Sequence, residues 1–139
     1  MDEFISDIVK IERSAEQIYS LMADMSCFSQ MASVSQIKEI EDFQSTQDTC
    51  SFKVKGVEVG IQIVDREPYK TIKYTRYKYA PVDFFIWLQL KEVAPDDTRI
   101  RIVLRAKLNL MMKTLLKGKI KKGLDKIVHQ ISESLNGKQ

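Results

Sequence analysis

The order of hydrophobic patterns along the chain constrains its fold more than any other feature. An alternating segment at residues 4–12 is followed by a short helical pattern, and residues 37–109 then read as a run of strands. One long helical pattern, from Leu110 to Leu135, ends this order. Consecutive strands form a sheet that must bury one face, and the last helix is long enough to cover it. We therefore expect an α+β fold with an antiparallel sheet curled around the C-terminal helix.

The first helix has a clear start. Ser14 followed by Gln17 matches a capping box, in which the hydroxyl accepts from the third helical N–H and the glutamine reaches back to the cap. The apolar residues after this cap, spaced three and four apart, are Ile18, Leu21, Met22 and Met25. A second short helix is expected around residues 28–32, and residues 33–36 read as a connector.

Five or six antiparallel strands are expected before the last helix, at about residues 37–43, 49–55, 57–66, 71–79, 84–93 and 98–108. Gly56 allows a tight reversal, Pro68 lies in a second turn, and Pro95-Asp96 begins a hairpin loop. The last strand alternates most regularly. Its apolar side carries Ile100, Ile102, Leu104, Ala106 and Leu108, and its basic side carries Arg99, Arg101, Arg105 and Lys107.

The strand at residues 84–93 is apolar on both faces, so its pattern alone does not orient it. A plain hairpin register through the following loop pairs Gln89 with Ile102 and Trp87 with Leu104. That register places Trp87 and Gln89 on the buried face. A one-residue bulge in the loop would reverse the choice. We favour the plain register.

The last helix presents apolar residues at spacings of three and four, and at ~1.5 Å per residue it is long enough to cross an entire sheet. These residues are Leu116, Ile120, Leu124, Ile127, Ile131 and Leu135. Gly118 and Gly123 each cost about 1 kcal/mol relative to alanine inside a helix. We therefore expect a close approach to the strands at these glycines, or a bend or break near Gly118.

The length and composition of the chain limit the classes of protein to which it can belong. The 139 residues fit one domain, 1–139, and no stretch reaches the ~18 apolar residues that span a membrane. The acidic N-terminus lacks the features of a secretion signal, so we expect a cytoplasmic protein with Cys27 and Cys50 reduced and packed as small apolar groups; a disulfide between them is the alternative. His129 is the one histidine, and the cysteines lack metal-ligand spacing, so no metal site is expected.

Charge is distributed unevenly. Residues 1–70 carry 7 Lys and Arg against 13 Asp and Glu, whereas the remainder of the chain is basic. Lys113, Lys117 and Lys121 follow one another at steps of four in the last helix. This stripe is either a solvated helix face or a surface for transient contact with an anionic membrane. Nucleic acid is not an expected partner, because no recognition motif or interleaved aromatic residues accompany the lysines.

Three segments carry a resemblance to a known superfamily: Ser14-Ala15-Glu16-Gln17-Ile18-Tyr19, Arg66-Glu67-Pro68 before Thr71-Ile72-Lys73-Tyr74, and Trp87-Leu88-Gln89-Leu90. Together with the order of elements they resemble the SRPBCC (START-like) superfamily, most of all its small bacterial polyketide cyclase/dehydratase-like members of unassigned activity. The resemblance covers essentially the whole chain. It implies a helix-grip fold like that of the birch-pollen allergen, with a curved seven-stranded antiparallel sheet around the C-terminal helix and two short helices after the first strand.

The resemblance implies binding or carriage of a small hydrophobic ligand, lipid or polyketide-like, in a cavity between the sheet and the C-terminal helix. It leaves open an aromatase/cyclase-type enzyme and a co-chaperone-like protein-interaction module. No cofactor is expected, and no catalytic residue is assigned because the enzymes of the superfamily share no catalytic motif. The oligomeric state is left open. The residues expected to line the cavity are Phe52, Tyr74, Arg76, Phe85, Trp87, Gln89, Ile102, Leu104, Met112, Leu116 and Ile120.

Overall fold

The structure, a computed structural model, describes residues 1–26, 40–54, 56–80 and 82–136. The expected second short helix at 28–32, its connector and Cys27 lie outside these residues. The elements in chain order are β1 (Asp2–Ile5), β2 (Val9–Ile11), α1 (Ala15–Met22), β3 (Ile40–Ser45), β4 (Thr49–Val54), β5 (Val57–Glu67), β6 (Thr71–Arg76), β7 (Phe84–Ala94), β8 (Asp97–Ala106) and α3 (Leu110–Asn136).

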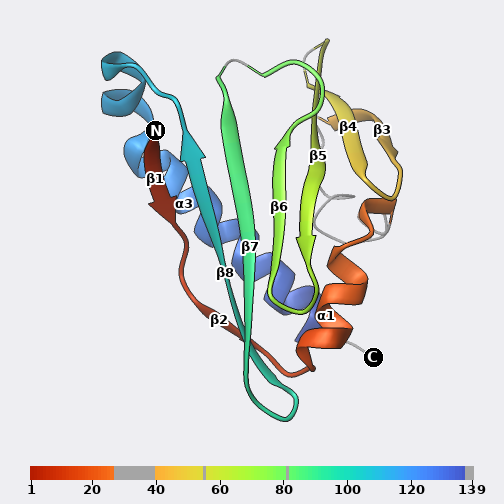
Figure 1. The fold of residues 1–139 in the computed structure, drawn as a ribbon. Coiled ribbons are helices and arrows are strands. Elements are labelled where there is room, and N and C mark those ends of the chain that lie inside the picture. The colour runs from red at the N-terminus through yellow and green to blue at the C-terminus, as the bar shows by residue number, and fades with distance from the viewer. Residues whose placement is uncertain (27–39, 55, 81, 137–139) are drawn as a thin grey trace.

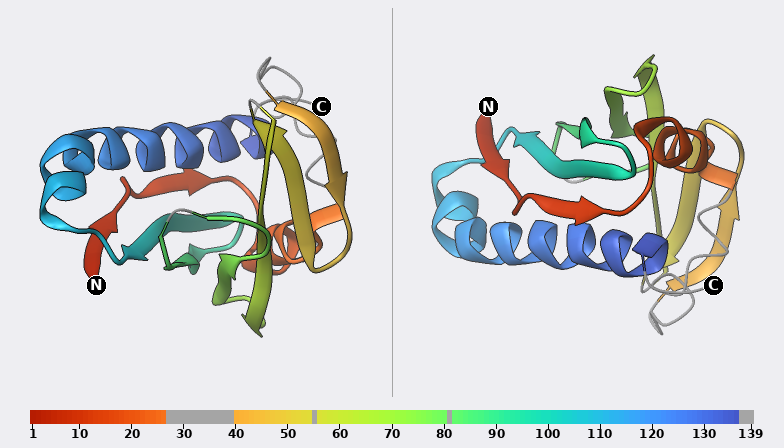
Figure 2. Two further views of the ribbon diagram at one scale, coloured as in Figure 1. Left: turned by 90° about the horizontal axis from the view of Figure 1, so that it is seen from above. Right: turned by 90° about the horizontal axis from the view of Figure 1, so that it is seen from below.

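The strands form one antiparallel sheet in the order β1-β8-β7-β6-β5-β4-β3, and β2 also pairs with β8. The expected N-terminal strand is thus interrupted between β1 and β2, where Ser6 bonds to the backbone of Ile102 through both its N–H and its hydroxyl. α3 lies on one side of the sheet, and the strands from β7 to β3 turn toward that side (Figures 1 and 2). The expected arrangement of a curved sheet around the last helix is confirmed.

One face of the sheet packs against the two helices and forms the core. We call this the inner face and the opposite one the outer face. β2, the strands from β4 to β8, α1 and α3 contribute to the buried cluster, which comprises Val9, Ile11, Ile18, Met22, Met25, Cys50, Ile63, Ile72, Tyr74, Leu88, Leu90, Ile100, Ile102, Leu124, Val128 and Ile131. Burial of apolar area at about 25 cal/mol per Å² drives this association.

The start of α1 follows the expected capping box. Ser14 accepts from the backbone N–H of Gln17, and the Gln17 side chain accepts from the N–H of Ser14. Ile18 and Met22 are buried as expected, but Leu21 is 40% exposed. Ala15 takes a buried place instead, because the helix rests on the sheet by its first turn, where Glu92 of β7 accepts from the Ala15 N–H at 2.8 Å.

Arg66 fixes the other end of α1. Its guanidinium donates to the carbonyl of Ala23 at 2.8 and 3.1 Å and pairs with Asp48 at 2.6 Å. This residue belongs to the Arg66-Glu67-Pro68 segment that carried the resemblance. It joins β5, the end of α1 and the β3–β4 turn, which fixes α1 beside the sheet.

α3 runs as one helix through both of its central glycines. A Cβ added at Gly118 or Gly123 would meet nothing within 4 Å, so the expected close approach to the strands is wrong. The alternative expectation of a bend fits better, since the first turns of α3 lie off the axis of the rest of the helix (Figure 2). The helix begins where the Asn109 side chain accepts from the N–H of Met112 at 2.8 Å.

Cys50 is a free, buried thiol, which agrees with the expected reduced cysteine packed as a small apolar group. Burial raises its pKa to about 11, so the thiol stays neutral at physiological pH. None of the helices in the described part of the chain is long and apolar enough to cross a membrane.

Candidate functional site

The register between β7 and β8 decides which side chains face α3. Gln89 pairs with Arg101 and Trp87 with Val103, and the register shifts between Glu92 and Ala94. The predicted plain register is therefore wrong, and the bulge that we considered as its alternative is present. Asp96 adopts a positive φ of 55° in the loop, which allows this tighter turn.

The bulge moves three expected lining residues to the outer face. Phe85, Trp87 and Gln89 alternate with Ile86, Leu88 and Leu90, and it is these last three that join the core. Phe85 and Trp87 pack together with their ring centroids 6.1 Å apart, and the Lys73 ammonium lies 4.6 Å from the centroid of Phe85. These side chains therefore do not lie between the sheet and α3.

The inner face divides into two parts that differ in burial. Toward the C-terminal half of α3, the contacts are closed: Leu88, Ile100 and Ile102 are buried in one cluster with Leu124 and Val128. A second part consists of apolar side chains that pack against this cluster but stay partly exposed. This half-open part contains Phe43, Phe52, Ile61, Ile86, Leu104 and Ile120.

Several of the expected lining residues thus lie on the inner face. Phe52, Leu104 and Ile120 belong to its half-open part, and Tyr74 and Ile102 to the closed core. Leu116 of α3 is also partly exposed. Ile61 and Ile86 were not among the residues expected from the sequence. Each alternates with polar or outer-face neighbours, and this pattern could have identified them once the register was known.

A shallow cleft of about 440 Å³ opens at the same end of the molecule. It lies between the β6–β7 connection and the β8–α3 connection, with Val82, Leu108 and Met112 among its lining residues. Met112 is thus placed at an opening beside the start of α3 and not deep under the sheet.

Tyr74 and Arg76, the polar residues expected to line the cavity, are not available to orient a ligand on the inner face. Tyr74 is almost fully buried, and burial raises the pKa of its hydroxyl far above the ordinary value, so it stays protonated. Arg76 is half-exposed and lies 3.4 Å from Asp83, so it faces water at the end of β6. Within the described ranges, no three His, Cys, Asp or Glu side chains come together as metal ligands.

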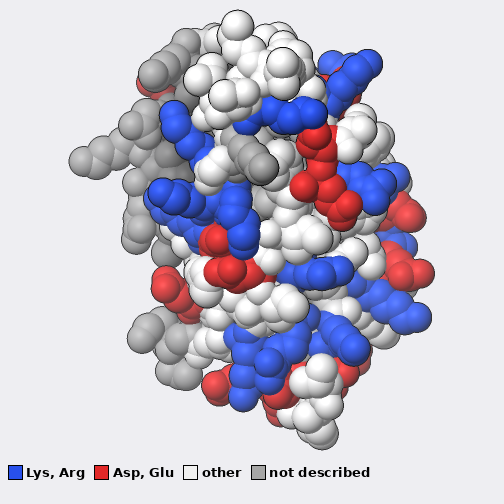
Figure 3. All heavy atoms as spheres, turned by 90° about the vertical axis from the view of Figure 1, so that its left-hand side faces the viewer, with Lys and Arg blue, Asp and Glu red and all other residues white. Residues whose placement is uncertain are grey.

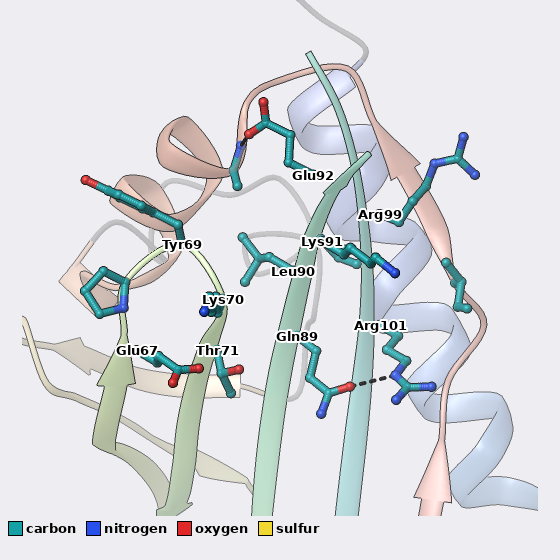
Figure 4. Close-up of a pocket in the computed structure, with 14 residues that line it drawn as sticks. Glu67, Tyr69, Lys70, Thr71, Gln89, Leu90, Lys91, Glu92, Arg99 and Arg101 are labelled. Carbon is teal, nitrogen blue, oxygen red and sulfur yellow. Dashed lines mark hydrogen bonds between the residues drawn. The ribbon is translucent and has the colours of Figure 1, made fainter. Parts of the chain in front are cut away.

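A larger cleft, of about 830 Å³, has lining residues from both faces of β7 and β8, and we call it the outer cleft because Gln89 and Arg101 line it from the outer face (Figure 4). It lies where the β5–β6 turn, β7 and β8 approach one another. Its lining residues are Ile8, Ala15, Glu67, Pro68, Tyr69, Lys70, Thr71, Gln89, Leu90, Lys91, Glu92, Arg99, Ile100 and Arg101. Apart from Gln89, none of these was selected from the sequence, because the register that brings them together was predicted wrongly.

The predicted lysine stripe on α3 is partly neutralised. Lys113 lies 3.2 Å from Asp2, and Lys121 pairs with Asp7 at 3.2 Å and with Asp125 at 2.8 Å. His129 lies 3.1 Å from Asp7, and its hydrogen bond, followed by that of Lys121, holds the pKa of Asp7 below its usual range. The side chain of Lys117 lies outside the described atoms.

A different surface of α3 is exposed and apolar at its start. Leu110 is 79% exposed, Met111 72% and Leu115 64%. Figure 3 shows an uncharged area at this end of the molecule, with Lys and Arg side chains next to it. By helical position, Lys119, Lys122 and Lys126 continue the face of Met111 and Leu115 along the helix, and all three are exposed.

Comparison with known proteins identifies the type of fold. No family model and no curated protein sequence matches the chain. Solved structures do match. A solution structure from Thermobifida fusca superposes with a TM-score of 0.70 at 12% identity, covering 96% of this chain and 92% of that one. The Aha1 dimer from Colwellia psychrerythraea gives a TM-score of 0.61 at 16% identity, covering 99% of this chain and 98% of that one.

A third match is BexL, a di-domain ARO/CYC from the BE-7585A biosynthetic pathway, with a TM-score of 0.73 at 10% identity. The match covers 96% of this chain but 46% of the BexL chain, so this chain spans about half of BexL. The chain has a helix-grip fold. Identities this low establish that fold and leave the activity of the chain to be argued from its own residues.

Proposed function

We propose that this protein belongs to the SRPBCC superfamily and binds and carries a small hydrophobic molecule, lipid or polyketide-like, between the half-open part of the inner face and the first half of α3. One observation carries the proposal. Apolar side chains from β3, β4, β5, β7, β8 and α3 pack against the buried cluster of the inner face and stay partly exposed. Covering such surface is favourable at about 25 cal/mol per Å².

Carriage is favoured over catalysis by the chemistry of this region. Acid–base catalysis requires titratable groups held near the substrate. Tyr74 is held neutral, and Arg76 is turned to Asp83 and water. The partly exposed residues that define the half-open part are all apolar, which suits an apolar ligand bound without chemical change. A cyclase would need two or more polar groups converging there.

Filling the half-open region should abolish ligand binding. We expect the variants Ile86→Trp and Leu104→Trp to weaken binding of the neutral fluorescent probe N-phenyl-1-naphthylamine by about tenfold or more, because the added rings occupy the space of the ligand. Fluorescence titration measures the affinity. Native mass spectrometry of the protein purified from its own host, followed by solvent extraction, identifies the natural ligand.

The matched control is Trp87→Ala, which removes an aromatic ring from the same strand but from the outer face. Its affinity for the probe should stay within about twofold of the parent. Equal affinity in all three variants, or loss in the Trp87 variant alone, would contradict binding on the inner face. Repeated recovery of empty protein from the host would contradict carriage.

A protein-interaction function is the second candidate, and the outer face favours it. Phe85 and Trp87 form a partly exposed aromatic pair, with Lys73 over both rings and the Arg105 guanidinium 5.7 Å from the centroid of Trp87. Aromatic and arginine side chains are enriched in interface hot spots. Trp87→Ala separates the two functions, since it should impair a protein partner and leave the inner-face ligand bound.

We also propose that the protein is cytoplasmic and binds anionic membranes transiently through the exposed start of α3. Leu110, Met111 and Leu115 offer apolar side chains to the interface, and the adjoining lysines attract anionic lipid. This surface replaces the lysine stripe expected from the sequence, in which Lys113 and Lys121 are paired with carboxylates. It lies beside the cleft at Met112, where a lipid would enter.

Vesicle binding tests this surface. The double variant Met111→Asp/Leu115→Asp should reduce co-sedimentation with phosphatidylserine-containing vesicles by about tenfold, since it removes two apolar anchors and adds repulsion. Parent binding should weaken with salt and be absent on pure phosphatidylcholine. Ile8→Asp, at an apolar position that is 63% exposed on another surface, is the control and should bind as the parent does. Equal loss in both variants would argue against the start of α3 as the contact.

A further inference from the structure

The outer cleft contains an arginine, Arg101, that has no carboxylate partner among the residues that the structure describes. Arg101 is partly buried, and its Nε donates to Gln89 Oε1 at 2.6 Å. The outward arginines on either side of it in β8 are paired: Arg99 with Asp97 at 2.9 Å, and Arg105 with Glu3 at 3.6 Å. Among these three, which all belong to the described residues, Arg101 alone has only a neutral partner.

The contact with Arg101 also orients the Gln89 amide. A guanidinium has only donors, so the amide oxygen must be the atom that faces it. The amide NH₂ of Gln89 is then turned to the other side as a donor. Figure 4 shows Gln89 and Arg101 side by side in the outer cleft, with their dashed contact between β7 and β8. The amide NH₂ of Gln89 and the remaining guanidinium N–H groups of Arg101 are all donors, and both side chains line the outer cleft.

Other cationic groups enter the same cleft from different elements. Lys70 comes from the β5–β6 turn and Lys91 from β7, and both are exposed. Of the two glutamates in the lining, Glu92 is engaged by the Ala15 N–H at 2.8 Å. Glu67 lies across the cleft from Arg101, beside Thr71 (Figure 4). Four basic side chains and two glutamates therefore line the cleft, and one of the glutamates is engaged by a backbone N–H.

We propose that the outer cleft binds the oxyanion of a small molecule, a carboxylate or a phosphate, with Arg101 and Gln89 as direct donors. A guanidinium matches the two oxygens of either group, and Lys70 and Lys91 add attraction at longer range. Tyr69, Pro68 and Ile8 line the cleft as well, so an apolar body attached to the anion would also be accommodated. The two proposed donors are on the face opposite to the proposed hydrophobic ligand, so the anion site does not depend on that proposal.

Titration of the isotope-labelled full-length protein with sodium phosphate and, separately, sodium benzoate tests the site by NMR at constant ionic strength. We expect at least one of the two anions to shift the Arg101 Nε–H and Gln89 NH₂ signals saturably, with a dissociation constant of about 1 mM or below. The anion that saturates distinguishes phosphate from carboxylate as the recognised group. A chloride titration that reproduces the shifts, or shifts spread over all surface lysines without saturation, overturns the proposal.

The variants Arg101→Gln and Arg105→Gln form a matched pair on the same strand and face. Arg101→Gln should weaken the anion by about tenfold to a hundredfold, because a charge-assisted hydrogen bond is lost, and Arg105→Gln by less than about twofold. Gln89→Leu should also weaken binding while leaving the Arg101 charge in place. Equal affinities in the two arginine variants, with native amide spectra for both, overturn the assignment.

Discussion

Replacing Val128 with aspartate should lower the free energy of unfolding by about 3–5 kcal/mol. Val128 is 0% exposed and lies in the cluster that joins α3 to the sheet. An aspartate there either remains ionised without a partner or binds a proton at a cost. Urea denaturation followed by circular dichroism measures the loss.

The pH dependence of this variant has a definite sign. Burial raises the folded-state pKa of the new carboxyl above its unfolded value near 3.9, so the folded state binds the proton more tightly. The destabilisation is therefore largest above the folded-state pKa and shrinks as the pH falls through it. We expect a smaller difference from the parent at about pH 4 than at about pH 7.

The neighbouring residue supplies the control. Ile127 is 48% exposed on the same helix, and Ile127→Asp should change the free energy of unfolding by about 0.5 kcal/mol or less. The two variants have the same chemistry at adjacent positions. Similar losses in both would mean that α3 does not present the face of Val128 to the sheet.

Gly60→Ala should destabilise the protein by about 1–3 kcal/mol, since the added methyl group overpacks two paired strands. An added Cβ would lie 2.7 Å from the carbonyl oxygen of Cys50 and 3.1 Å from the Cβ of Ser51. Both neighbours belong to β4, which is paired with β5 at this point, so relief requires movement of the backbone. Thermal unfolding measures the change.

Gly118→Ala is the matched control for this substitution. A Cβ at Gly118 meets nothing within 4 Å, and alanine is the better helix former by about 1 kcal/mol. We therefore expect the same chemical change to stabilise α3. Destabilisation by both alanines, or by Gly118→Ala alone, would contradict the open surroundings of Gly118.

Much of the fold could be predicted from local patterns. The capping box at Ser14 and Gln17 is present, the strand ranges from β4 to β8 agree within a few residues, and the last helix extends from Leu110 to Asn136. Each of these features depends on residues within a few positions of one another. Alternation, cap chemistry and helical spacing are therefore sufficient to predict them.

The candidate sites could not be predicted to the same degree, and β7 shows why. Its two faces are both apolar, so the choice between Trp87 and Leu88 for the core depended on a bulge between Glu92 and Ala94. Shifting the register by one residue turned Gln89 to the outer face and brought it to Arg101. The contact that defines the outer cleft joins residues twelve positions apart, and no local pattern marks it.

The sequence by itself determined the kind and order of the elements, because hydrophobic period and capping act over one or two turns of chain. Only the tertiary structure decided which face of β7 is inner, that Arg101 has no carboxylate partner among the described residues, and which apolar side chains of the inner face stay partly exposed. These features depend on the register and curvature of the paired strands, and both are set by packing over the whole sheet. The helix and strand propensities of single residues do not determine that packing.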